Sequence, residues 1–307
     1  MDKFVIFEIP LHKYESLEQL GTKRKFWFRD DSDNKLKLFK IGREKTGENW
    51  VEVVVSYICE LLDIPHAKYE FATWDHICGT ISESFVPEKG RLVHGNEVLA
   101  KTYEVVDSSV EYPVDKYKVR EYQLKLVNSI MKTLSFELPL GYKNQSCKTC
   151  FDVFISYILL DCLISNGDRH HENWGFIVHE SKVFLTPTYD HASGLGCREP
   201  DSKKVERLGT RDENYQVRSF VKRARTPFFN KDKMITTLEA FEICANYDKT
   251  IAFYWLEKLE TLDLEKVRNI FDKVPSHLIS PVSIEFAIKM LEENKIRLLE
   301  LKEVLLK

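Results

Sequence analysis

The chain has 307 residues, of which 43% are hydrophobic and 30% charged, and its formal net charge is −3. This composition is typical of a soluble globular protein with one large domain or two lobes, and the small net charge gives no general case for direct nucleic-acid binding. No apolar run approaches the roughly 20 residues of a membrane-spanning helix, and the N-terminal apolar stretch is too short for a signal peptide. We therefore expect a cytoplasmic protein with no membrane partner.

The seven cysteines are scattered along the chain, and their odd number favours reduced thiols over a disulfide framework. Cys147 and Cys150 form a CxxC pair that could serve as a redox pair or as half of a zinc site. No second CxxC and no histidine pair at zinc-finger spacing accompanies it, and the pair opens an apolar helix. A metal or redox role is therefore the less favoured interpretation.

The first 90 residues predict a β-rich lobe that contains one helix. Aromatic and β-branched runs predict strands at residues 4–8, 25–29, 35–41, 68–73 and 80–86. Residues 49–62 predict the helix, because Val55, Cys59 and Leu62 share a packing face. Pro87-Glu88-Lys89-Gly90 interrupts the pattern, so we divide the chain into an N-terminal lobe of residues 1–90 and a C-terminal lobe of residues 91–307.

Two features of the N-terminal lobe have both a functional and an ordinary explanation. The turn around Gly21 and Thr22 could bind phosphates through its backbone N–H groups, although any hairpin could use a single glycine. Lys40 ends the third predicted strand, and Glu52 lies in the first turn of the predicted helix. A lysine there commonly marks an exposed strand end, and a glutamate there complements the helix dipole. The order of a lysine strand followed by a glutamate helix is nevertheless that of kinases, in which the two side chains pair.

Helical spacing dominates from residue 91 onward. Helices are predicted at residues 119–134 and 151–163, and three more close the chain at residues 238–244, 251–258 and 284–306. Residues 198–225 are polar and rich in both charges, and they include the basic run Val221-Lys222-Arg223-Ala224-Arg225. Such a run is more often a solvated face than a substrate-docking segment, and both interpretations stay open.

Residues 164–195 carry the candidate site. Asp168, His170 and Asn173 follow the apolar helix predicted at 151–163, and Asp190 follows a hairpin predicted from strands 174–178 and 183–186. The hairpin folds the second carboxylate back towards the first. Phosphoryl transfer has a use for this set, because one carboxylate can accept the proton of the attacking hydroxyl while an amide and a second carboxylate hold Mg²⁺. The alternative is a solvated loop, since Asp, Asn, His and Gly are ordinary turn residues.

The pattern D-x-H-x-x-N, a hairpin and then L-T-P-x-Y-D resembles that of the HipA-like kinases, which are known chiefly from bacterial toxin–antitoxin systems. Residues 168–173 (DRHHEN) and 185–190 (LTPTYD) carry the resemblance. The family is similar in fold to protein kinases and phosphoinositide kinases but lacks their usual HRD and DFG motifs. This chain lacks them too, with Asn166-Gly167-Asp168 and Tyr189-Asp190-His191 in their places.

The resemblance implies a two-lobed α+β fold, with a β-rich nucleotide-binding lobe and a mainly helical catalytic lobe. It implies a kinase that uses ATP and Mg²⁺ to phosphorylate a serine or threonine hydroxyl of a protein. Asp168 would be the catalytic base with His170 beside it, and Asn173 and Asp190 would bind the metal. The residues expected to bind ATP are Gly21, Thr22, Lys25, Lys40, Glu52, Glu83, Ser84, Phe85, His170, Asn173, Tyr189 and Asp190. Glu83 to Phe85 would contribute their backbone at the adenine edge.

Three other functions remain open at this point. A small-molecule kinase of the aminoglycoside or choline type has a similar Asp-to-Asn spacing. A nucleotide-binding pseudokinase is disfavoured because Lys40, Asp168, Asn173 and Asp190 are all present. A metal hydrolase could use Asp168, His170, His171 and Asp190, and a site so rich in imidazole favours Zn²⁺ over Mg²⁺.

The chain also departs from the HipA-like toxins. Those toxins often carry a regulatory serine just ahead of the phosphate-binding turn, where this chain has Glu18. Self-silencing by phosphorylation would then use Ser16 or Thr22, or be absent. The toxins also carry a small extra N-terminal subdomain, for which this chain begins too close to its turn. We therefore expect that such a part, where one exists, resides in a small antitoxin or accessory protein.

Overall fold

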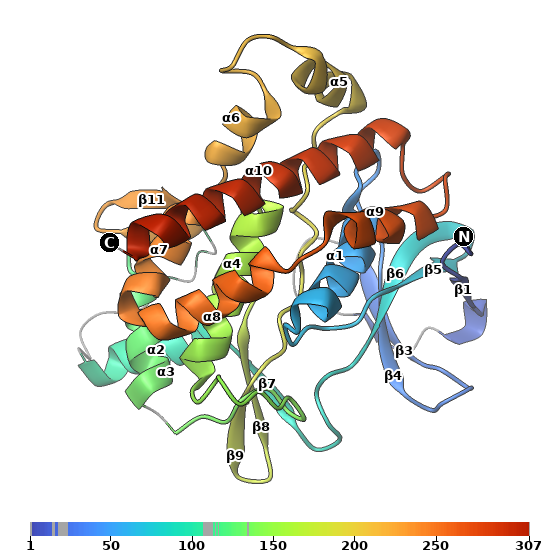
Figure 1. Ribbon diagram of the computed structural model, residues 1–307. Helices are drawn as coiled ribbons and strands as arrows, with labels where there is room; N and C mark the ends of the chain where they lie inside the picture. Colours follow the sequence, from blue (N-terminus) through green and yellow to red (C-terminus); the bar gives the residue numbers. More distant parts are fainter. Residues whose placement is uncertain are drawn as a thin grey trace.

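The computed structural model describes residues 2–13, 16–17, 24–106, 113, 115, 117–133 and 135–306. A six-stranded sheet with helix α1 against it forms one end of the molecule, and a mainly helical part with a three-stranded sheet forms the other (Figure 1). This arrangement agrees with the predicted α+β fold. No helix in the described part of the chain is both long enough and apolar enough to cross a membrane.

The six-stranded sheet has the order β1-β5-β6-β4-β3-β2, in which β1 runs parallel to β5 and every other pairing is antiparallel. Large apolar side chains, among them Phe26, Phe28 and Phe39, form a core on one face. The strands are β1 (Ile6–Ile9), β2 (Ser16–Leu17), β3 (Lys25–Arg29), β4 (Leu36–Lys40), β5 (Glu70–Trp74) and β6 (Ile77–Glu83), with a 3₁₀ turn at Leu11–Lys13 after β1.

Helix α1 (Glu48–Leu62) packs against β5 and β6. Its run of valines is buried because the helix lies between the sheet and the helical part. Since α1 begins at Glu48, Glu52 lies in its second turn and not in the first turn as predicted. Strand β6 begins three residues earlier than the predicted strand of residues 80–86, so Ser84 and Phe85 follow the strand and do not belong to it.

The three-stranded sheet has the order β7-β8-β9, and both of its pairings are antiparallel. The predicted hairpin is present as β8 and β9, whereas β7 was not predicted. The elements of this region are β7 (Arg91–His94), α2 (Gly95–Val106), α3 (Leu124–Thr133), α4 (Cys150–Ile164), β8 (Gly175–His179) and β9 (Lys182–Leu185).

Helix α4 is the centre of the helical part, and all of its side chains are buried. A capping box fixes its first turn: the Thr149 hydroxyl accepts a hydrogen bond from the Asp152 N–H, and the Asp152 carboxylate accepts one from the Thr149 N–H. Ser165 ends the helix in the left-handed conformation, with φ of 54°. The buried helix predicted ahead of the candidate site is therefore present and has fixed ends.

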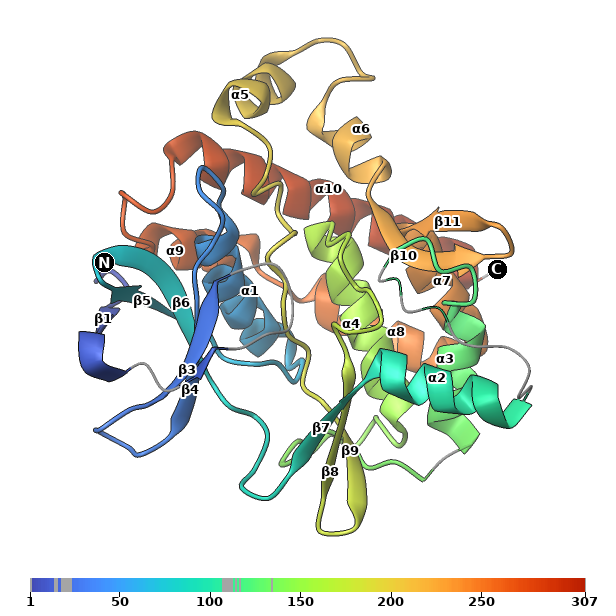
Figure 2. The ribbon, with the colours of Figure 1, turned by 180° about the vertical axis from the view of Figure 1, so that it is seen from behind.

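The C-terminal region wraps around α4, and the long helix α10 crosses its outer side (Figure 2). Both ribbon views show α5 and α6 projecting from the body beyond α10. The elements are α5 (Asp201–Gly209), α6 (Val217–Lys222), β10 (Arg225–Asn230), β11 (Lys233–Thr236), α7 (Thr237–Tyr247), α8 (Lys249–Glu260), α9 (Leu264–Lys273) and α10 (Pro281–Leu305).

Two helix predictions need correction here. The helix expected from residue 119 begins at Leu124, because Val119 and Tyr122 form a turn that buries Tyr122 and brings its hydroxyl to the carbonyl of Arg169 at 2.9 Å. Helix α9 was missed between the predicted closing helices. Its buried Val267, Ile270 and Phe271 share one face at i, i+3 and i+4 spacing, so the sequence does contain the stripe of an amphipathic helix there.

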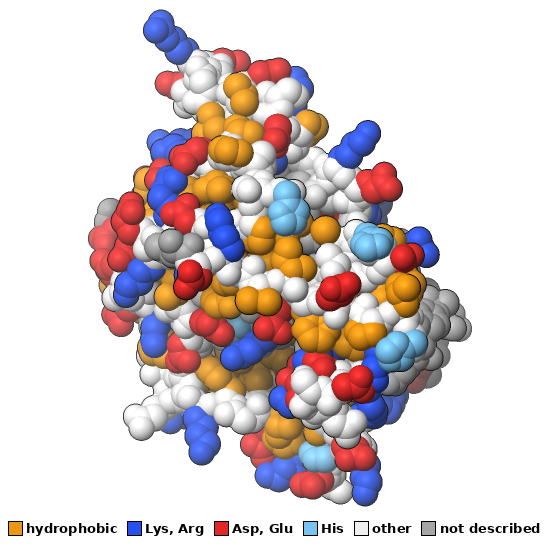
Figure 3. Space-filling view, turned by 90° about the vertical axis from the view of Figure 1, so that its right-hand side faces the viewer, with side chains coloured by type: hydrophobic (Ala, Val, Ile, Leu, Met, Phe, Trp, Pro, Cys, Tyr) orange, Lys and Arg blue, Asp and Glu red, His pale blue; other side chains and the backbone are white. Residues whose placement is uncertain are grey.

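The charges of the surface are mixed. Figure 3 shows Lys and Arg side chains interspersed with Asp and Glu over the face that it presents, with apolar groups between them. This face therefore has no broad basic surface of the kind that follows a nucleic-acid backbone.

Candidate active site

A cavity of ≈ 1070 Å³ lies between the six-stranded sheet and the segment that contains the candidate site residues. Strands β3, β4 and β6 and the residues after β6 line one side, and the other side is lined by His170, Glu172, Asn173, Tyr189 and Asp190. Predicted site residues that line the cavity are Lys25, Lys40, Glu83, Ser84, Phe85, His170, Asn173, Tyr189 and Asp190. The fold thus brings together residues that lie up to 165 positions apart in the sequence.

Lys40 is the buried cation of this cavity. Its ammonium lies 3.7 Å from a Glu52 carboxylate oxygen, 3.9 Å from Asp190 Oδ1 and 3.4 Å from the Tyr69 hydroxyl. Burial alone would lower the pKa of Lys40, but the surrounding negative groups outweigh burial and raise the pKa above its usual value. Lys40 is therefore charged at neutral pH, and the predicted Lys40–Glu52 pair is formed.

Glu52 and Tyr69 each hold two parts of the site. Besides facing Lys40, Glu52 accepts a hydrogen bond of 2.9 Å from the backbone N–H of His191. The Tyr69 hydroxyl lies between Lys40 and the backbone N–H of Asp190, which donates to it at 3.3 Å. Helix α1 and strand β4 are thereby tied to the segment that carries Asp190.

A buried network fixes the loop after α4. Asp161 on α4 accepts two hydrogen bonds from the Arg169 guanidinium, at 2.7 and 2.8 Å, and one from the Asn166 amide at 2.7 Å. Arg169 also donates to the carbonyl of Asn173 at 2.7 Å. The side chains of Asp161, Asn166 and Arg169 are buried, so the loop is attached to the rigid helix by charge-assisted bonds that exclude water.

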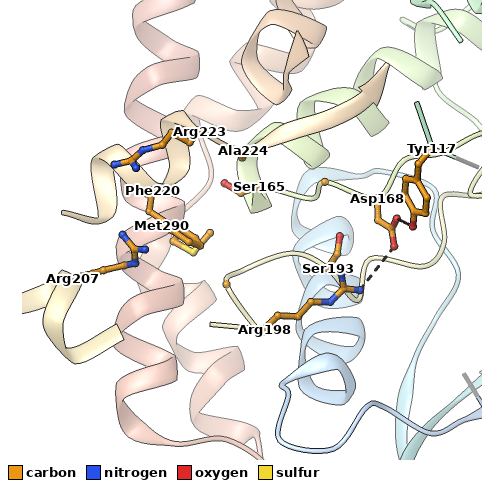
Figure 4. A pocket seen from close by; sticks show the side chains of 12 residues that line it. Tyr117, Ser165, Asp168, Ser193, Arg198, Arg207, Phe220, Arg223, Ala224 and Met290 are labelled. Carbon is orange, nitrogen blue, oxygen red and sulfur yellow. Dashed lines mark hydrogen bonds and ion pairs between the residues drawn. The ribbon is translucent and has the colours of Figure 1, made fainter. Parts of the chain in front are cut away.

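Asp168 points away from this network and towards solvent, with its side chain about one quarter exposed. Its carboxylate accepts a hydrogen bond of 2.5 Å from the Tyr117 hydroxyl (Figure 4). His170 Nε2 lies 4.0 Å from Asp168 Oδ1, and an Arg198 nitrogen lies 4.0 Å from Oδ2. A partly exposed carboxylate with donors on both sides can orient an incoming hydroxyl and accept its proton.

Asn173 and Asp190 present oxygens of the kind that Mg²⁺ prefers. The Asn173 amide nitrogen donates to the Asp168 carbonyl at 2.6 Å, so its Oδ1 is the atom that remains as a ligand. Asp190 has φ of 58°, an uncommon conformation for a residue other than glycine. Its side chain is one third exposed and lies opposite Lys40. The donor set therefore fits a magnesium ion that is bound together with nucleotide phosphates.

The far end of the cavity is aromatic and suits a flat base. The rings of Phe85 and Tyr189 stack with their centroids 5.4 Å apart. The Tyr189 hydroxyl donates to the Glu172 carbonyl at 2.8 Å and lies 3.2 Å from His94 Nδ1. The Glu83 carboxylate pairs with Lys35 at 2.8 Å near the surface, so the backbone after β6 and not this carboxylate faces the cavity's aromatic end.

Comparison with known proteins gives a fold and a partial sequence match. No family model matches the chain. It is 29% identical over 156 residues to the serine/threonine-protein kinase CtkA of Helicobacter pylori, an alignment that spans 49% of this chain and 45% of CtkA. The crystal structure of this proinflammatory kinase CtkA superposes with a TM-score of 0.72 at 20% identity, covering 99% of this chain and 97% of CtkA.

A second solved structure is that of HipA from the Shewanella oneidensis MR-1 toxin–antitoxin system, in complex with HipB and its operator DNA. It matches with a TM-score of 0.56 at 12% identity, covering 96% of this chain and 70% of HipA. The chain has the fold of the HipA-like kinases. The predicted resemblance is confirmed at this level, and the sequence alignment with the curated relative covers about half of its length.

Two of the predicted ATP-binding residues cannot be placed in this HipA-like fold. Gly21, Thr22 and Glu18 lie outside the described residues. Ser16, the other residue considered for self-silencing, is described in β2, where its backbone pairs with that of Trp27. Lys25 lies at the cavity and pairs in register with Lys40 across β3 and β4.

The burial of the cysteine pair and of His171 disfavours the redox and zinc-hydrolase alternatives. Cys147 and Cys150 are buried, and burial raises the pKa of each thiol to about 12, so both stay protonated and unreactive at neutral pH. Within the described ranges, no three His, Cys, Asp or Glu side chains converge as a metal site. His171 is fully buried with its ring 5.7 Å from that of Tyr122, so it packs in the interior and does not face the cavity.

Four side chains around the candidate site were missed from the sequence: Tyr69, His94, Tyr117 and Arg198. Each reaches the site from a separate element or loop, and none belongs to a local motif. Arg198 was included only in a charged segment of undefined role. The role of Arg169 could have been inferred from the sequence. Asp161 lies in an apolar helix that is expected to be buried, and a buried carboxylate needs a nearby cation, which the loop after the helix supplies.

Proposed function

We propose that the protein is an ATP- and Mg²⁺-dependent kinase that phosphorylates a serine or threonine hydroxyl of another protein. The observation that carries this proposal is the position of Lys40. A buried, charged ammonium lies between Glu52 and Asp190 at the inner wall of a cavity large enough for a nucleotide. Asn173 lies on the opposite wall, and the loop that carries it also carries Asp168, which lines the neighbouring pocket on the side from which an acceptor could approach.

In this proposal, each residue has one role in phosphoryl transfer. Lys40, oriented by Glu52, binds phosphate oxygens, and Phe85 and Tyr189 hold the base. Asn173 and Asp190 hold the metal. Asp168 receives the proton of the acceptor hydroxyl, and His170 beside it donates to phosphate or braces the loop. The bound Mg²⁺ would neutralise charge on the phosphates, which is the main requirement of this chemistry.

The type of acceptor follows from the named relative. CtkA is a serine/threonine-protein kinase, and its structure extends over nearly the whole of this chain. Asp168 also lies at an open surface with a second pocket beside it, so a protein segment can reach the base. A small-molecule kinase remains the alternative, and the chemical nature of the labelled product separates the two.

We also propose a protein partner. HipA was solved with HipB, and the family is known chiefly from toxin–antitoxin systems. A small antitoxin-like or accessory protein that restrains the kinase is the corresponding hypothesis for this chain. Co-purification of the tagged chain from its native host, followed by mass spectrometry, would identify such a partner.

The first prediction concerns Asp168. The purified protein, incubated with γ-labelled ATP, Mg²⁺ and a bacterial lysate, should transfer label to protein, and Asp168→Asn should reduce transfer by about 10²–10⁴-fold because the proton acceptor is lost. ATP affinity of the variant should stay within a few-fold of the wild type. Phosphoamino-acid analysis would identify the labelled residue.

The matched control is Asp190→Asn, which should weaken ATP binding in the presence of Mg²⁺ as well as transfer. Full activity of Asp168→Asn would refute the assignment of the base. Label found only in small molecules would favour the aminoglycoside or choline type of kinase, and binding of ATP without transfer would favour a pseudokinase.

A further inference from the structure

A second pocket of ≈ 480 Å³ lies on the open side of Asp168, away from the nucleotide cavity. Figure 4 shows Asp168 and Tyr117 at one end of it and Arg207, Arg223 and Phe220 at the other. The walls come from the loop after α4, from residues 193–198, from α5 and α6, and from α10. The pocket therefore begins where the acceptor hydroxyl must enter.

Three arginines line this pocket, against the single carboxylate of Asp168. Arg198 is oriented by the buried Glu48, which accepts a hydrogen bond of 3.2 Å from its Nε. This contact turns the far end of the guanidinium towards Asp168, at 4.0 Å. The Arg198 side chain is nevertheless 46% exposed, so its remaining N–H groups can meet a ligand.

The other two arginines are held by the protein but keep donors for a ligand. Arg207 stacks between Tyr215 and Phe220, with its guanidinium carbon 4.3 and 4.7 Å from the two ring centroids, and it pairs with Glu199 at 2.8 Å. Arg223 is exposed and donates to the carbonyls of Ser219 and Asn214. Fixed guanidinium groups bind a carboxylate with little further loss of side-chain entropy.

The positive charge of the surrounding segment also favours an acidic ligand. Residues 198–225 contain nine Lys or Arg and five Asp or Glu, a net charge of +4 in a chain whose total is −3. These residues form α5, α6 and the connections that project beyond α10 (Figure 1). The positive excess thus lies beside the acceptor side of Asp168, where it can attract an acidic ligand.

We propose that this pocket binds an acidic side chain of the protein substrate, next to the serine or threonine that Asp168 deprotonates. The inference rests on the proposed kinase function and adds the class of substrate sequence. Asp168 alone would repel acidic residues near the acceptor, and Arg198 offsets that repulsion at 4.0 Å. Phe220, Ala224 and Met290 supply an apolar floor that suits the methylene groups of a glutamate.

The test uses three peptides with one serine flanked on both sides by glutamates, alanines or lysines. For the wild type, kcat/KM should be about tenfold higher for the glutamate peptide than for the alanine peptide, a ratio that one charge-assisted contact supplies. The lysine peptide should be the poorest substrate. Equal values for the glutamate and alanine peptides would overturn the inference.

Variants locate the preference within the pocket. Arg223→Gln and Arg198→Gln should each reduce the ratio of glutamate to alanine peptide to about threefold or less. Lys222→Gln removes the same charge from the neighbouring position outside the pocket and should keep the full ratio. An equal loss of the ratio in Lys222→Gln would mean that the general field of the segment, and not the pocket, is responsible, and would refute the inference.

A binding measurement separates this inference from the proposed function. Fluorescence anisotropy with peptides whose serine is replaced by alanine needs no turnover. Tighter binding of the acidic peptide by the wild type, lost in Arg223→Gln and kept in Lys222→Gln, supports the pocket even if no peptide is phosphorylated. Acidic peptide that binds no better than the alanine peptide contradicts it, whatever the activity of the protein.

Discussion

Glu52 shows how a single residue can set the geometry of the cavity between the sheet and the candidate site residues. One carboxylate oxygen faces the Lys40 ammonium, and the other accepts a hydrogen bond from the backbone next to Asp190. A change in either contact therefore alters the distance between Lys40, the proposed phosphate-binding residue, and the proposed metal carboxylate of Asp190. Glu52 therefore both balances the charge of Lys40 and fixes the distance between Lys40 and the segment that carries Asp190.

Tyr117 gives a second prediction at the residue scale. Its hydroxyl donates to Asp168 Oδ1 at 2.5 Å, in a place that the acceptor hydroxyl of the proposed reaction would have to take. Burial and the bond to Asp168 raise the pKa of Tyr117, so it is a neutral donor at physiological pH. Tyr117→Phe should raise kcat/KM for a peptide acceptor by a few-fold and at most about tenfold, since an exposed bond to a charged group contributes about 1 kcal/mol.

Steady-state kinetics with varied peptide and varied ATP check this prediction. KM for ATP should not change, because Tyr117 lies on the acceptor side of Asp168. A fall in kcat would mean that the tyrosine orients the carboxylate for catalysis and does not compete with the acceptor. Tyr103→Phe, on α2, is the matched control for loss of a tyrosine hydroxyl.

At the scale of elements, α4 and the loop behind it form one unit. The helix is apolar and fully buried, yet it contains Asp161, which binds Arg169 and Asn166. A buried carboxylate in such a helix requires a partner, and the partner is the loop that carries Asp168. This contact holds the loop that carries Asp168 in a fixed position relative to α4.

The third prediction concerns that contact. Arg169→Met should lower the free energy of unfolding by about 3–5 kcal/mol, because it leaves the Asp161 charge buried without its counter-ion. The double variant Asp161→Leu/Arg169→Met should recover part of the loss. Urea denaturation followed by circular dichroism measures both.

The control is Arg268→Met, which breaks a surface pair with Glu285 at 2.7 Å and should cost less than about 1 kcal/mol. A loss in Arg169→Met as small as that of the control would show that water solvates Asp161 and that the pair does not fix the loop.

The elements differ in how well the sequence predicted them. Strands β3 and β4, helix α4 and the β8–β9 hairpin lie within one or two residues of the predicted bounds, since their apolar period or turn chemistry is local and strong. Helices α5 and α9 were missed. Helix α5 is very polar and buries only Lys204, so no buried apolar face marks it in the sequence. Helix α9 does have an apolar stripe, formed by Val267, Ile270 and Phe271, so its signal was present in the sequence.

At the scale of the whole molecule, residues 188–191 connect the sheet to the helical part. The Ala67 and Thr188 N–H groups donate to the carbonyls of Thr188 and Pro65, each at 2.9 Å, and Glu52 binds the backbone of His191. The sequence could indicate that Asp190 belongs to the site. It could not indicate these contacts, which join residues more than 100 positions apart and depend on how the two parts pack.

Two histidines at this connection, His191 and the half-buried His66, give the last prediction. His191 is fully buried, with Nε2 2.9 Å from the Thr188 hydroxyl, and burial together with the nearby charge of Arg169 lowers its pKa well below the usual range. Burial also lowers the pKa of His66, whose backbone pairs with that of Thr188. Both side chains are therefore neutral in the folded protein at neutral pH.

The sign of the effect follows from proton uptake. The unfolded chain binds a proton at each of these histidines near pH 6.5, and the folded chain does not, so the free energy of unfolding falls as pH decreases below that value. The stability that the two neutral histidines contribute is fully present above about pH 7. Below that, each histidine lowers the free energy of unfolding by up to about 1.4 kcal/mol per pH unit. Urea midpoints should therefore decrease between about pH 7 and pH 5.5, before most carboxylates protonate.

His191→Gln should remove a substantial part of this pH dependence, although it also lowers stability at pH 7 by disturbing the bond to Thr188. The slope against pH, and not the absolute stability, is therefore the quantity to compare. His277→Gln, at an exposed position, is the matched control. An unchanged slope in His191→Gln would show that this imidazole gains a proton in the folded state, so that the connection between the two parts opens to water as the pH falls.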